Sequence, residues 1–213
     1  MSRARAFPAV PTRTLVVDAA RPDPGALAEA ASVLRGGGLV AFPTESFYGL
    51  GTAALAPDAV ARVFEVKGRP ESKPLLVLVG SPEDVVPLCG EIGEGARELM
   101  RRHWPGPLTL VLPAAAGVPT AVTAGTGTIG VRVPGHPVAL GLVRAAGLAV
   151  TAPSANPSGE APAETAAAVR GYFDGRIDLV LDGGPTSGGT GSTVADCTVW
   201  PPRILRQGPV RLS

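Results

Sequence analysis

The chain has 213 residues, 45% of them hydrophobic and 17% charged, and its formal net charge is +1. This length and hydrophobic content fit one domain with an ample core, and they argue against a chain that is disordered overall. The near-neutral charge argues against a protein that holds nucleic acid by bulk electrostatics, although a local basic cleft remains compatible with it.

Apolar runs bounded by turn residues alternate with helix-like stretches along the chain. The apolar runs predict strands over 14–19, 39–43, 75–79, 108–112, 128–133, 148–152 and 178–182, and two more over 193–199 and 203–206. The intervening stretches predict helices over 24–35, 57–66, 93–104, 136–146 and 163–173, and a short capped helix over 81–88.

This alternation predicts a single α/β (α+β) domain over 14–210, because no linker or internal repeat divides the chain. We expect one twisted, mixed parallel/antiparallel sheet, flanked by helices and hollowed into a concave basic cleft. Residues 1–13 are basic and contain prolines but lack an apolar segment, so we interpret them as a flexible N-terminal tail rather than a targeting segment. No apolar stretch approaches the roughly 18 residues that a membrane span needs. We therefore expect a cytoplasmic protein without membrane contact.

Several well-known catalytic and metal-binding motifs are missing. Cys89 and Cys197 are the only cysteines and have no CxxC spacing, which argues against a disulfide framework and a structural zinc site. GTGTIG (125–130) has the GxGxxG spacing but precedes a strand rather than a helix, and neither a GxxxxGK[ST] loop nor a GxSxG elbow is present. Neither His103 nor His136 has a partner at metal-ligand spacing, and we expect His136 to begin a helix.

Five polar segments interrupt the ends of apolar strands, where α/β domains place their ligands. They supply cations, hydroxyls and backbone N–H groups, but no obvious covalent nucleophile. That inventory suits displacement at phosphorus, in which positioning and charge stabilisation do most of the catalysis. The segments are PTESFYGLG (43–51), KGRPESKPL (67–75), TIGVRVP (128–134), TAPSANPSG (151–159), and DGGPTSGGTGSTV (182–194) together with ILRQG (204–208).

Two cationic features lie within these segments. Only two of the 19 lysines and arginines are lysines, Lys67 and Lys73. With Arg69 they form a candidate polyphosphate clamp, unless their placement reflects no more than compositional drift. Arg132 stands inside an apolar strand and needs an anion, which is either a ligand or a structural partner such as Asp182.

Six blocks occur in a fixed order along the chain: PTESFYGLG, KGRPESKPL, WPGPLTLVL, VRVPGHP, TAPSANPSG and the ending GSTV…ILRQG. In these blocks the chain resembles the single-domain form of the YrdC-like threonylcarbamoyl-AMP synthases, from about residue 14 to 210. The pair of KxR (67–69) and SxN (154–156) makes the resemblance specific.

The resemblance implies an L-threonylcarbamoyladenylate synthase, a nucleotidyltransferase that joins L-threonine, bicarbonate and ATP into threonylcarbamoyl-AMP and pyrophosphate, with Mg²⁺ accompanying ATP. A tRNA-modifying threonylcarbamoyl transferase complex would then use the adenylate, so we expect at most weak direct tRNA contact. The motifs assign threonine binding to Ser46, Arg132, Ala152 and Ser192. They assign ATP binding to Lys67, Arg69, Thr128, Ser154, Pro162, Arg206, Lys73 and Asn156, with Lys67 and Arg69 also catalytic.

Two positions depart from the family pattern. Ser46 stands where the family commonly has Thr, and this change keeps the hydroxyl. Leu78 stands where the family often has His, which removes a polar contact expected near the amino acid.

Two alternatives remain beside this hypothesis. One is the carbamoyl-adenylate-handling module of hydrogenase-maturation proteins, which is usually part of a longer multidomain chain. The other is an RNA-binding module whose basic face grips a duplex or tRNA, but few cations contribute to such a face and aromatic residues are only 4% of the chain.

Overall fold

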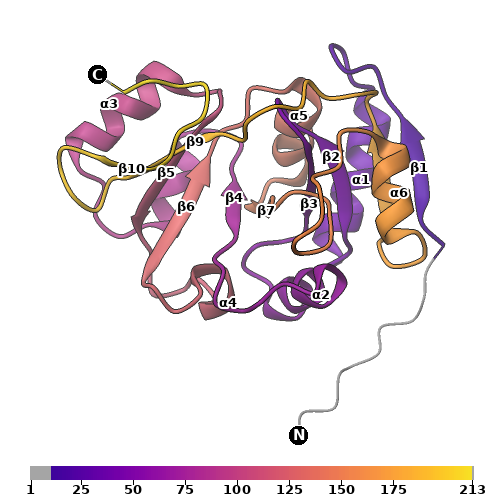
Figure 1. Ribbon diagram of the computed structural model, residues 1–213, viewed down its shortest axis with the longest axis horizontal. Coiled ribbons are helices and arrows are strands. Elements are labelled where there is room, and N and C mark those ends of the chain that lie inside the picture. The colour runs from indigo at the N-terminus through magenta and orange to yellow at the C-terminus, as the bar shows by residue number, and fades with distance from the viewer. Residues whose placement is uncertain (1–10, 213) are drawn as a thin grey trace, which may run out of the picture.

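The computed structural model describes residues 11–212, which form two mixed β-sheets with helices packed around them (Figure 1). The first sheet has the order β1-β8-β2-β3. Its strands are β1 (Arg13–Val16), β8 (Leu179–Asp182), β2 (Val40–Pro43) and β3 (Tyr48–Gly51). The first three run parallel to one another, and β3 runs antiparallel to β2.

The second sheet has the order β10-β9-β5-β6-β4-β7. Its β9 runs parallel to β5 and its β4 runs parallel to β6, whereas the other neighbouring pairs are antiparallel. The strands are β10 (Arg203–Arg206), β9 (Thr193–Asp196), β5 (Leu108–Pro113), β6 (Thr128–Arg132), β4 (Leu76–Leu78) and β7 (Val150–Thr151).

Helices cover both faces of the first sheet. Successive residues of a strand point to opposite sides, and in this sheet the residues on both sides are apolar and pack against helices. Leu179 and Leu181 of β8 pack with α1 and α5 in one core cluster, whereas Val180 packs with α2 and α6 in the other. The helices are α1 (Pro24–Arg35), α2 (Pro57–Lys67), the 3₁₀ helix η1 (Glu83–Leu88), α3 (Glu94–His103), α4 (Thr120–Thr123), α5 (Pro137–Ala146) and α6 (Ala166–Phe173).

The helix ends follow from local sequence. The Asp23 carboxylate accepts a hydrogen bond from the Ala26 amide at 2.8 Å, and proline occupies the first position of α1. His136 begins α5 as expected, because its Nδ1 accepts a hydrogen bond from the Val138 amide at 3.2 Å. Helix α2 ends at Gly68, whose φ of 57° is the left-handed conformation that glycine adopts most readily. This end places Lys67 and Arg69 beside the loop that follows.

The mixed α/β class and most of the predicted elements are confirmed, but the expected single sheet is divided into two. The two sheets are close to continuous, since isolated bridges join Gly49 to Ser154 and Ala53 to Val150. Strand β3 was not predicted, because glycine is depleted from strands. Gly51 is needed there, since a Cβ at this position would lie 2.7 Å from the side chains of both Phe42 and Val150.

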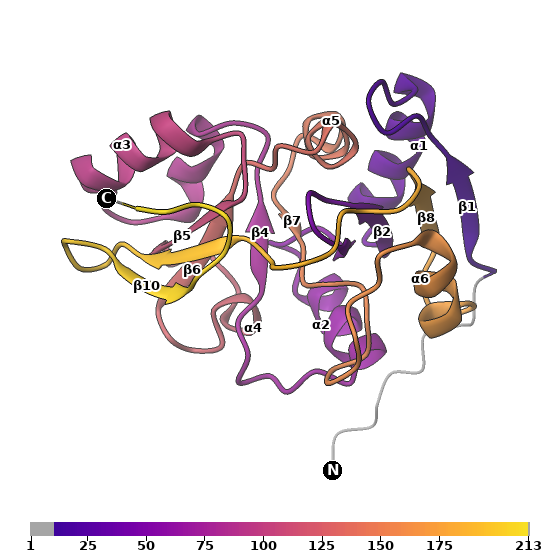
Figure 2. The same cartoon turned by 45° about the horizontal axis from the view of Figure 1, so that its top comes forward.

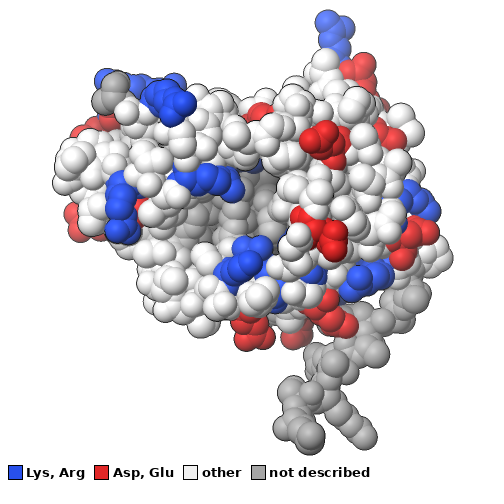
Figure 3. Space-filling view, in the orientation of Figure 1, with Lys and Arg blue, Asp and Glu red and all other residues white. Residues whose placement is uncertain are grey.

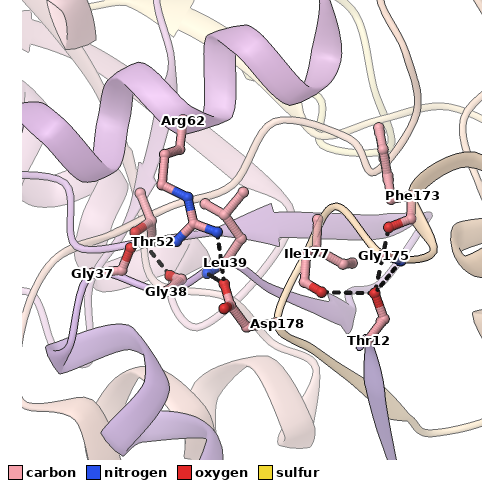
Figure 4. Close-up of polar contacts among 10 residues, drawn as sticks. All are labelled: Thr12, Gly37, Gly38, Leu39, Thr52, Arg62, Phe173, Gly175, Ile177 and Asp178. Carbon is pink, nitrogen blue, oxygen red and sulfur yellow. Dashed lines mark hydrogen bonds and ion pairs between the residues drawn. The ribbon is translucent and has the colours of Figure 1, made fainter. Parts of the chain in front are cut away.

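Buried polar contacts fix the start of β2 against α2 (Figure 4). Asp178 accepts a hydrogen bond from the Leu39 amide at 2.7 Å and pairs with Arg62 of α2 at 3.2 Å. The Thr12 hydroxyl donates to the Ile177 carbonyl at 2.7 Å, so Thr12 is part of the fold although the predicted tail includes it. Residues 1–10 of that tail lie outside the described residues.

A glycine-rich segment, residues 183–192, connects β8 of the first sheet to β9 of the second (Figure 2). The Ser187 hydroxyl donates to the Glu45 carbonyl at 2.5 Å, and the Gly188 amide donates to the Ser46 carbonyl at 2.9 Å. The segment is therefore bound to the loop before β3. Within residues 11–212, no helix is both long and apolar enough to cross a bilayer.

Candidate active site

A cavity of about 550 Å³ lies between the two sheets. The second sheet contributes side chains from β5, β6, β9 and β10, and the first contributes the loop before β3 together with β3 itself. The remaining wall comes from the loop that follows α2 and Leu76 of β4, from Thr126, from residues 152–154 and Pro162, and from Gly191 and Ser192 before β9. Figure 3 shows a hollow in this face of the molecule, with Lys and Arg side chains on its rim.

Strand β6 directs alternate residues into the cavity. Thr128, Gly130 and Arg132 point to the same face of the strand, and all three line the wall. Gly130 contributes no side chain, and a Cβ there would lie 3.5 Å from the Thr109 side chain on the neighbouring strand. The glycine therefore leaves room in front of β5 and β6.

Arg132 is the central charged group of the wall. Its side chain is only 4% exposed, and its nearest anion is Glu45, whose Oε2 lies 3.6 Å from the Arg132 Nη2. In the described chain the Arg132 Nε has no hydrogen-bond partner, and neither has the Glu45 Oε2. Burial lowers the pKa of Arg132, Glu45 partly offsets this effect, and Arg206 adds to it. A buried guanidinium with so few partners is suited to bind an anion.

Asp182, the structural partner considered for Arg132, binds elsewhere. Its Oδ1 accepts a hydrogen bond from the Gly184 amide at 3.0 Å and lies 3.5 Å from the Tyr48 hydroxyl, which donates to the Gly184 carbonyl at 2.7 Å. Burial and the charge of Asp182 raise the pKa of Tyr48 to about 12, so this hydroxyl stays protonated. The acidic neighbour of Arg132 is Glu45, whose other oxygen accepts from the Gly135 amide at 2.7 Å.

Arg206 supplies a second cation from β10. Its Nε donates to the Ser192 carbonyl at 3.0 Å, and its Nη2 donates to the Ser192 hydroxyl at 3.1 Å. The Ser192 hydroxyl in turn lies 2.8 Å from the Thr109 hydroxyl of β5. Burial lowers the pKa of Arg206, and a nearby anion would oppose that effect.

Arg69 supplies a third cation, from the loop after α2. Its guanidinium donates to the Lys73 carbonyl at 3.2 Å and to the Pro74 carbonyl at 2.8 Å. These bonds hold the side chain on the cavity wall and leave Nη1 with no bond to another described residue. Lys73 itself is exposed and does not line the cavity.

Lys67 lies behind the wall rather than on it. Its side chain is buried, and its Nζ donates to the carbonyls of Ser154 and Asn156, both at 2.5 Å. Burial and the charge of Arg69 lower the pKa of Lys67 to about 8. Its carbonyl also accepts from the Ser158 amide at 2.7 Å. Lys67 therefore holds the loop that presents Ser154 to the cavity.

Asn156 has a comparable position. Its amide donates to the carbonyls of Pro157 and Glu160, both at 2.8 Å, and it does not line the cavity. Its Oδ1 is buried without a hydrogen-bond partner among residues 11–212. The KxR and SxN motifs thus meet as one structural unit, in which Lys67 and Asn156 shape the loop and Arg69 and Ser154 face the cavity.

The cavity brings together nine of the twelve residues assigned from the sequence: Ser46, Arg69, Thr128, Arg132, Ala152, Ser154, Pro162, Ser192 and Arg206. Lys67, Lys73 and Asn156 do not line it. Leu78 does not reach it either, because this side chain is fully buried in the core cluster that contains α1 and α5.

Sequence reasoning did not single out several wall residues. Thr109 is one of them, and a hydroxyl within the apolar run LTLVL could have indicated it. Phe47 and Leu205 also line the wall; they lie within the predicted segments 43–51 and 204–208, but nothing distinguished them individually, because isolated apolar residues resemble ordinary core positions.

Carboxylates and other metal ligands are scarce around the cavity. Within the described part of the chain, no group of three or more His, Cys, Asp or Glu side chains could hold a metal ion. Any metal bound in this cavity would therefore take most of its ligands from another molecule or from water.

A family model described as "Telomere recombination" and named for Sua5, YciO and YrdC matches residues 32–208. The threonylcarbamoyl-AMP synthase of Pyrococcus abyssi is 48% identical over 184 residues, and that of Bacillus subtilis is 45% identical over 185 residues. Each match covers 86% of this chain and 54% of the relative, so the chain spans about half the length of these relatives. The putative threonylcarbamoyl-AMP synthase of Mycobacterium tuberculosis is 40% identical over 185 residues, 86% of this chain and 84% of that protein.

Solved structures share the fold. The structure of P. abyssi Sua5 complexed with L-threonine has a TM-score of 0.88 and 46% identity, and the match covers 92% of this chain and 57% of that one. E. coli YciO has a TM-score of 0.84 at 24% identity, over 93% of this chain and 96% of that one.

Proposed function

The chain belongs to the Sua5/YciO/YrdC family, and we propose that it is an L-threonylcarbamoyladenylate synthase. As such it is a nucleotidyltransferase that converts L-threonine, bicarbonate and ATP into threonylcarbamoyl-AMP and pyrophosphate. The names of its relatives and the threonine complex of one of them support this assignment.

One observation carries the proposal. Arg132 and Arg206 line the same cavity from strands of one sheet, and Arg132 is buried with no hydrogen-bonded anion among the described residues. Arg69 adds a third cation to this cavity, and several cations in one cavity suit a reaction that brings two anions together, a carboxylate and a nucleotide polyphosphate.

The amino acid fits the end of the cavity around Arg132. Its carboxylate pairs with Arg132, and Ser46, Ser192 and the backbone of Ala152 supply further polar contacts there. The nucleotide fits the remaining wall, which consists of Arg69, Thr128, Ser154, Pro162 and Arg206. Lys73 approaches the nucleotide from outside, whereas Lys67 and Asn156 act by holding the Ser154 loop.

The reaction proceeds in two steps, carboxylation of the amine and transfer of the adenylyl group. The uncharged α-amine of threonine forms a bond to the carbon of bicarbonate, and water leaves, which gives N-carboxythreonine. An oxygen of the new carboxylate then forms a bond to the α-phosphorus of ATP. The bond from that phosphorus to the pyrophosphate oxygen breaks, and pyrophosphate leaves with the electron pair. Arg69 and Arg206 stabilise the charge that accumulates on the phosphate oxygens.

Mg²⁺ enters this scheme as part of the MgATP substrate. The described residues contain no acidic cluster that would hold it as a resident metal, so its ligands are the phosphates and water. The adenylate product then passes, in the cytoplasm, to a threonylcarbamoyl transferase complex that modifies tRNA. The protein itself contacts tRNA at most weakly.

Incubation of the protein with MgATP, bicarbonate and each amino acid in turn tests the proposal. We expect pyrophosphate and a threonylcarbamoyl adenylate only when threonine and bicarbonate are both present. Arg132→Met serves as the matched variant with weakened threonine binding, and its circular dichroism and melting temperature verify that it is folded. Pyrophosphate release that does not depend on threonine would contradict the assignment, as would tight RNA binding at physiological salt without ATP turnover.

A further inference from the structure

Two nearly dry hydroxyls meet on the cavity wall. The Thr109 side chain of β5 is 3% exposed and that of Ser192, next to β9, is 4% exposed. Their hydroxyl oxygens lie 2.8 Å apart, which is a hydrogen bond. Both groups are shielded from bulk solvent, so their hydrogen-bonding capacity is satisfied by protein atoms or by what occupies the cavity that they line.

One of the two hydroxyl protons of this pair is not used in a hydrogen bond within the described protein. The Arg206 Nη2 lies 3.1 Å from the Ser192 hydroxyl, and a guanidinium can only donate, so Ser192 accepts this bond. The two hydroxyls carry one proton each, and the bond between them uses one. No described residue accepts a hydrogen bond from either hydroxyl beyond this contact. The second proton is therefore available to the cavity, which both side chains line.

The position of the pair indicates which ligand receives that proton. Strand β5 lies between β9 and β6, with Thr109 in register with Val194 on one side. On the other side Leu110 is in register with Val131, so Thr109 and Arg132 are close neighbours across the two strands. Gly130 leaves the space in front of Thr109 open, because a Cβ there would lie 3.5 Å from the Thr109 methyl group. The pair thus faces the end of the cavity that holds Arg132.

We propose that Thr109 is a further substrate-binding residue, and that the Thr109–Ser192 pair donates its remaining proton to an anionic oxygen of the amino-acid substrate held by Arg132. This inference rests on the proposed function and adds a residue to it. Arg206 donates to Ser192, and either hydroxyl can donate in the bond between Thr109 and Ser192, so the remaining proton stays on the hydroxyl that accepts that bond. The pair connects the nucleotide end of the cavity with the amino-acid end.

Thr109→Val and Thr109→Ser form the matched test, because valine keeps the shape without the hydroxyl and serine keeps the hydroxyl. The measurements are the KM values for threonine and ATP in pyrophosphate release, the threonine Kd by calorimetry, and the melting temperature. We expect Thr109→Val to raise the threonine KM and Kd about tenfold or more, the range for one hydrogen bond to a charged group, with the ATP KM little changed. Thr109→Ser should stay within about threefold of the wild type.

Two further variants separate binding from folding. Thr109→Val/Ser192→Ala removes both hydroxyls and should weaken threonine binding more than Thr109→Val does alone. Thr52→Val removes a fully buried hydroxyl that donates to the Gly38 carbonyl, and neither residue lines the cavity, so it should lower the melting temperature without changing the threonine KM.

The inference is overturned if Thr109→Val binds threonine like the wild type, or if the threonine and ATP constants rise together with a lower melting temperature. Either result can occur while the wild-type protein still forms the adenylate, which leaves the proposed function intact. A wild-type protein that releases no pyrophosphate with threonine overturns both.

Discussion

The charge state of Lys67 should be visible in the pH dependence of stability. The side chain is 2% exposed and its Nζ donates to two backbone carbonyls. Burial and the charge of Arg69 lower its pKa from 10.5 to about 8. In the unfolded chain the group titrates near its ordinary value. Between pH 8 and 10.5 the unfolded chain therefore holds one more proton at this residue than the folded chain does.

Stability rises with pH wherever the unfolded state binds more protons. The interval between the two pKa values corresponds to a destabilisation of about 3 kcal/mol by the charged amine. This destabilisation is fully present below pH 8 and is gone above pH 10.5. A neutral amine still has two N–H groups for the carbonyls of Ser154 and Asn156, so the loop keeps its bonds when the proton leaves.

Other buried groups act in the opposite direction over the same range. Burial raises the pKa of Tyr48 to about 12 and those of Cys89 and Cys197 to about 11, so their titration lowers stability at high pH. The informative quantity is therefore the difference between the wild type and Lys67→Met. Tyr48, Cys89 and Cys197 are present in both proteins, so their contributions to the pH dependence of stability cancel in this difference. The carbonyls left unpaired in the variant add a destabilisation that does not depend on pH.

Urea unfolding at pH 7 to 10.5 measures this difference. The free energy of unfolding of the wild type, relative to Lys67→Met, should rise by about 3 kcal/mol across the range. A difference that stays constant with pH would show that the two carbonyl bonds compensate fully for burial, and that Lys67 is a permanent cation.

Four further substitutions, one of them a control, test the site and the fold. Arg132→Ala should raise the threonine KM at least tenfold in a pyrophosphate-release assay, since a charge-assisted bond is lost; an unchanged KM in a less stable protein would make Arg132 structural. Gly208→Ala should lower stability by about 1–3 kcal/mol in urea unfolding, because a Cβ would collide with the backbone of Gly191 and Thr193, whereas Gly117→Ala, in open space, should be tolerated. Equal stability of the two variants would argue against that packing. Gly171→Ala should raise stability by about 0.5–1 kcal/mol, because Gly171 lies inside α6 with nothing within 4 Å, and a lower melting temperature would contradict this.

The sequence was most informative where one residue type conflicted with its surroundings. Arg132 within an apolar strand and the polar segments at strand ends predicted the cavity, because a buried charge needs a partner wherever it lies. The helix starts at Asp23 and His136 were predictable from the same kind of local rule, since the side chain of each accepts from a nearby amide.

Other features depend on contacts that no local pattern contains. The segment containing Gly49 and Gly51 looks like a loop, and it becomes β3 because the side chains of Phe42 and Val150 leave no space for a Cβ at Gly51. The position of Lys67 depends on where α2 ends and on how closely residues 154–156 approach that end. A scarce lysine beside two polar motifs indicated a functional cation. The sequence could not show whether the Lys67 side chain points into the cavity or toward the loop behind its wall.

The two kinds of cation have different tasks in the described site. Lys67 carries a compact ammonium that reaches two converging carbonyls at once and stays behind the wall. The cations that line the cavity are Arg69, Arg132 and Arg206, and a guanidinium can hold the backbone with one edge while it offers another edge to a ligand. This geometry would allow a ligand to bind without releasing the loops that form the wall. It also predicts that replacing an arginine of the wall by lysine would not preserve both functions, even though the charge is the same.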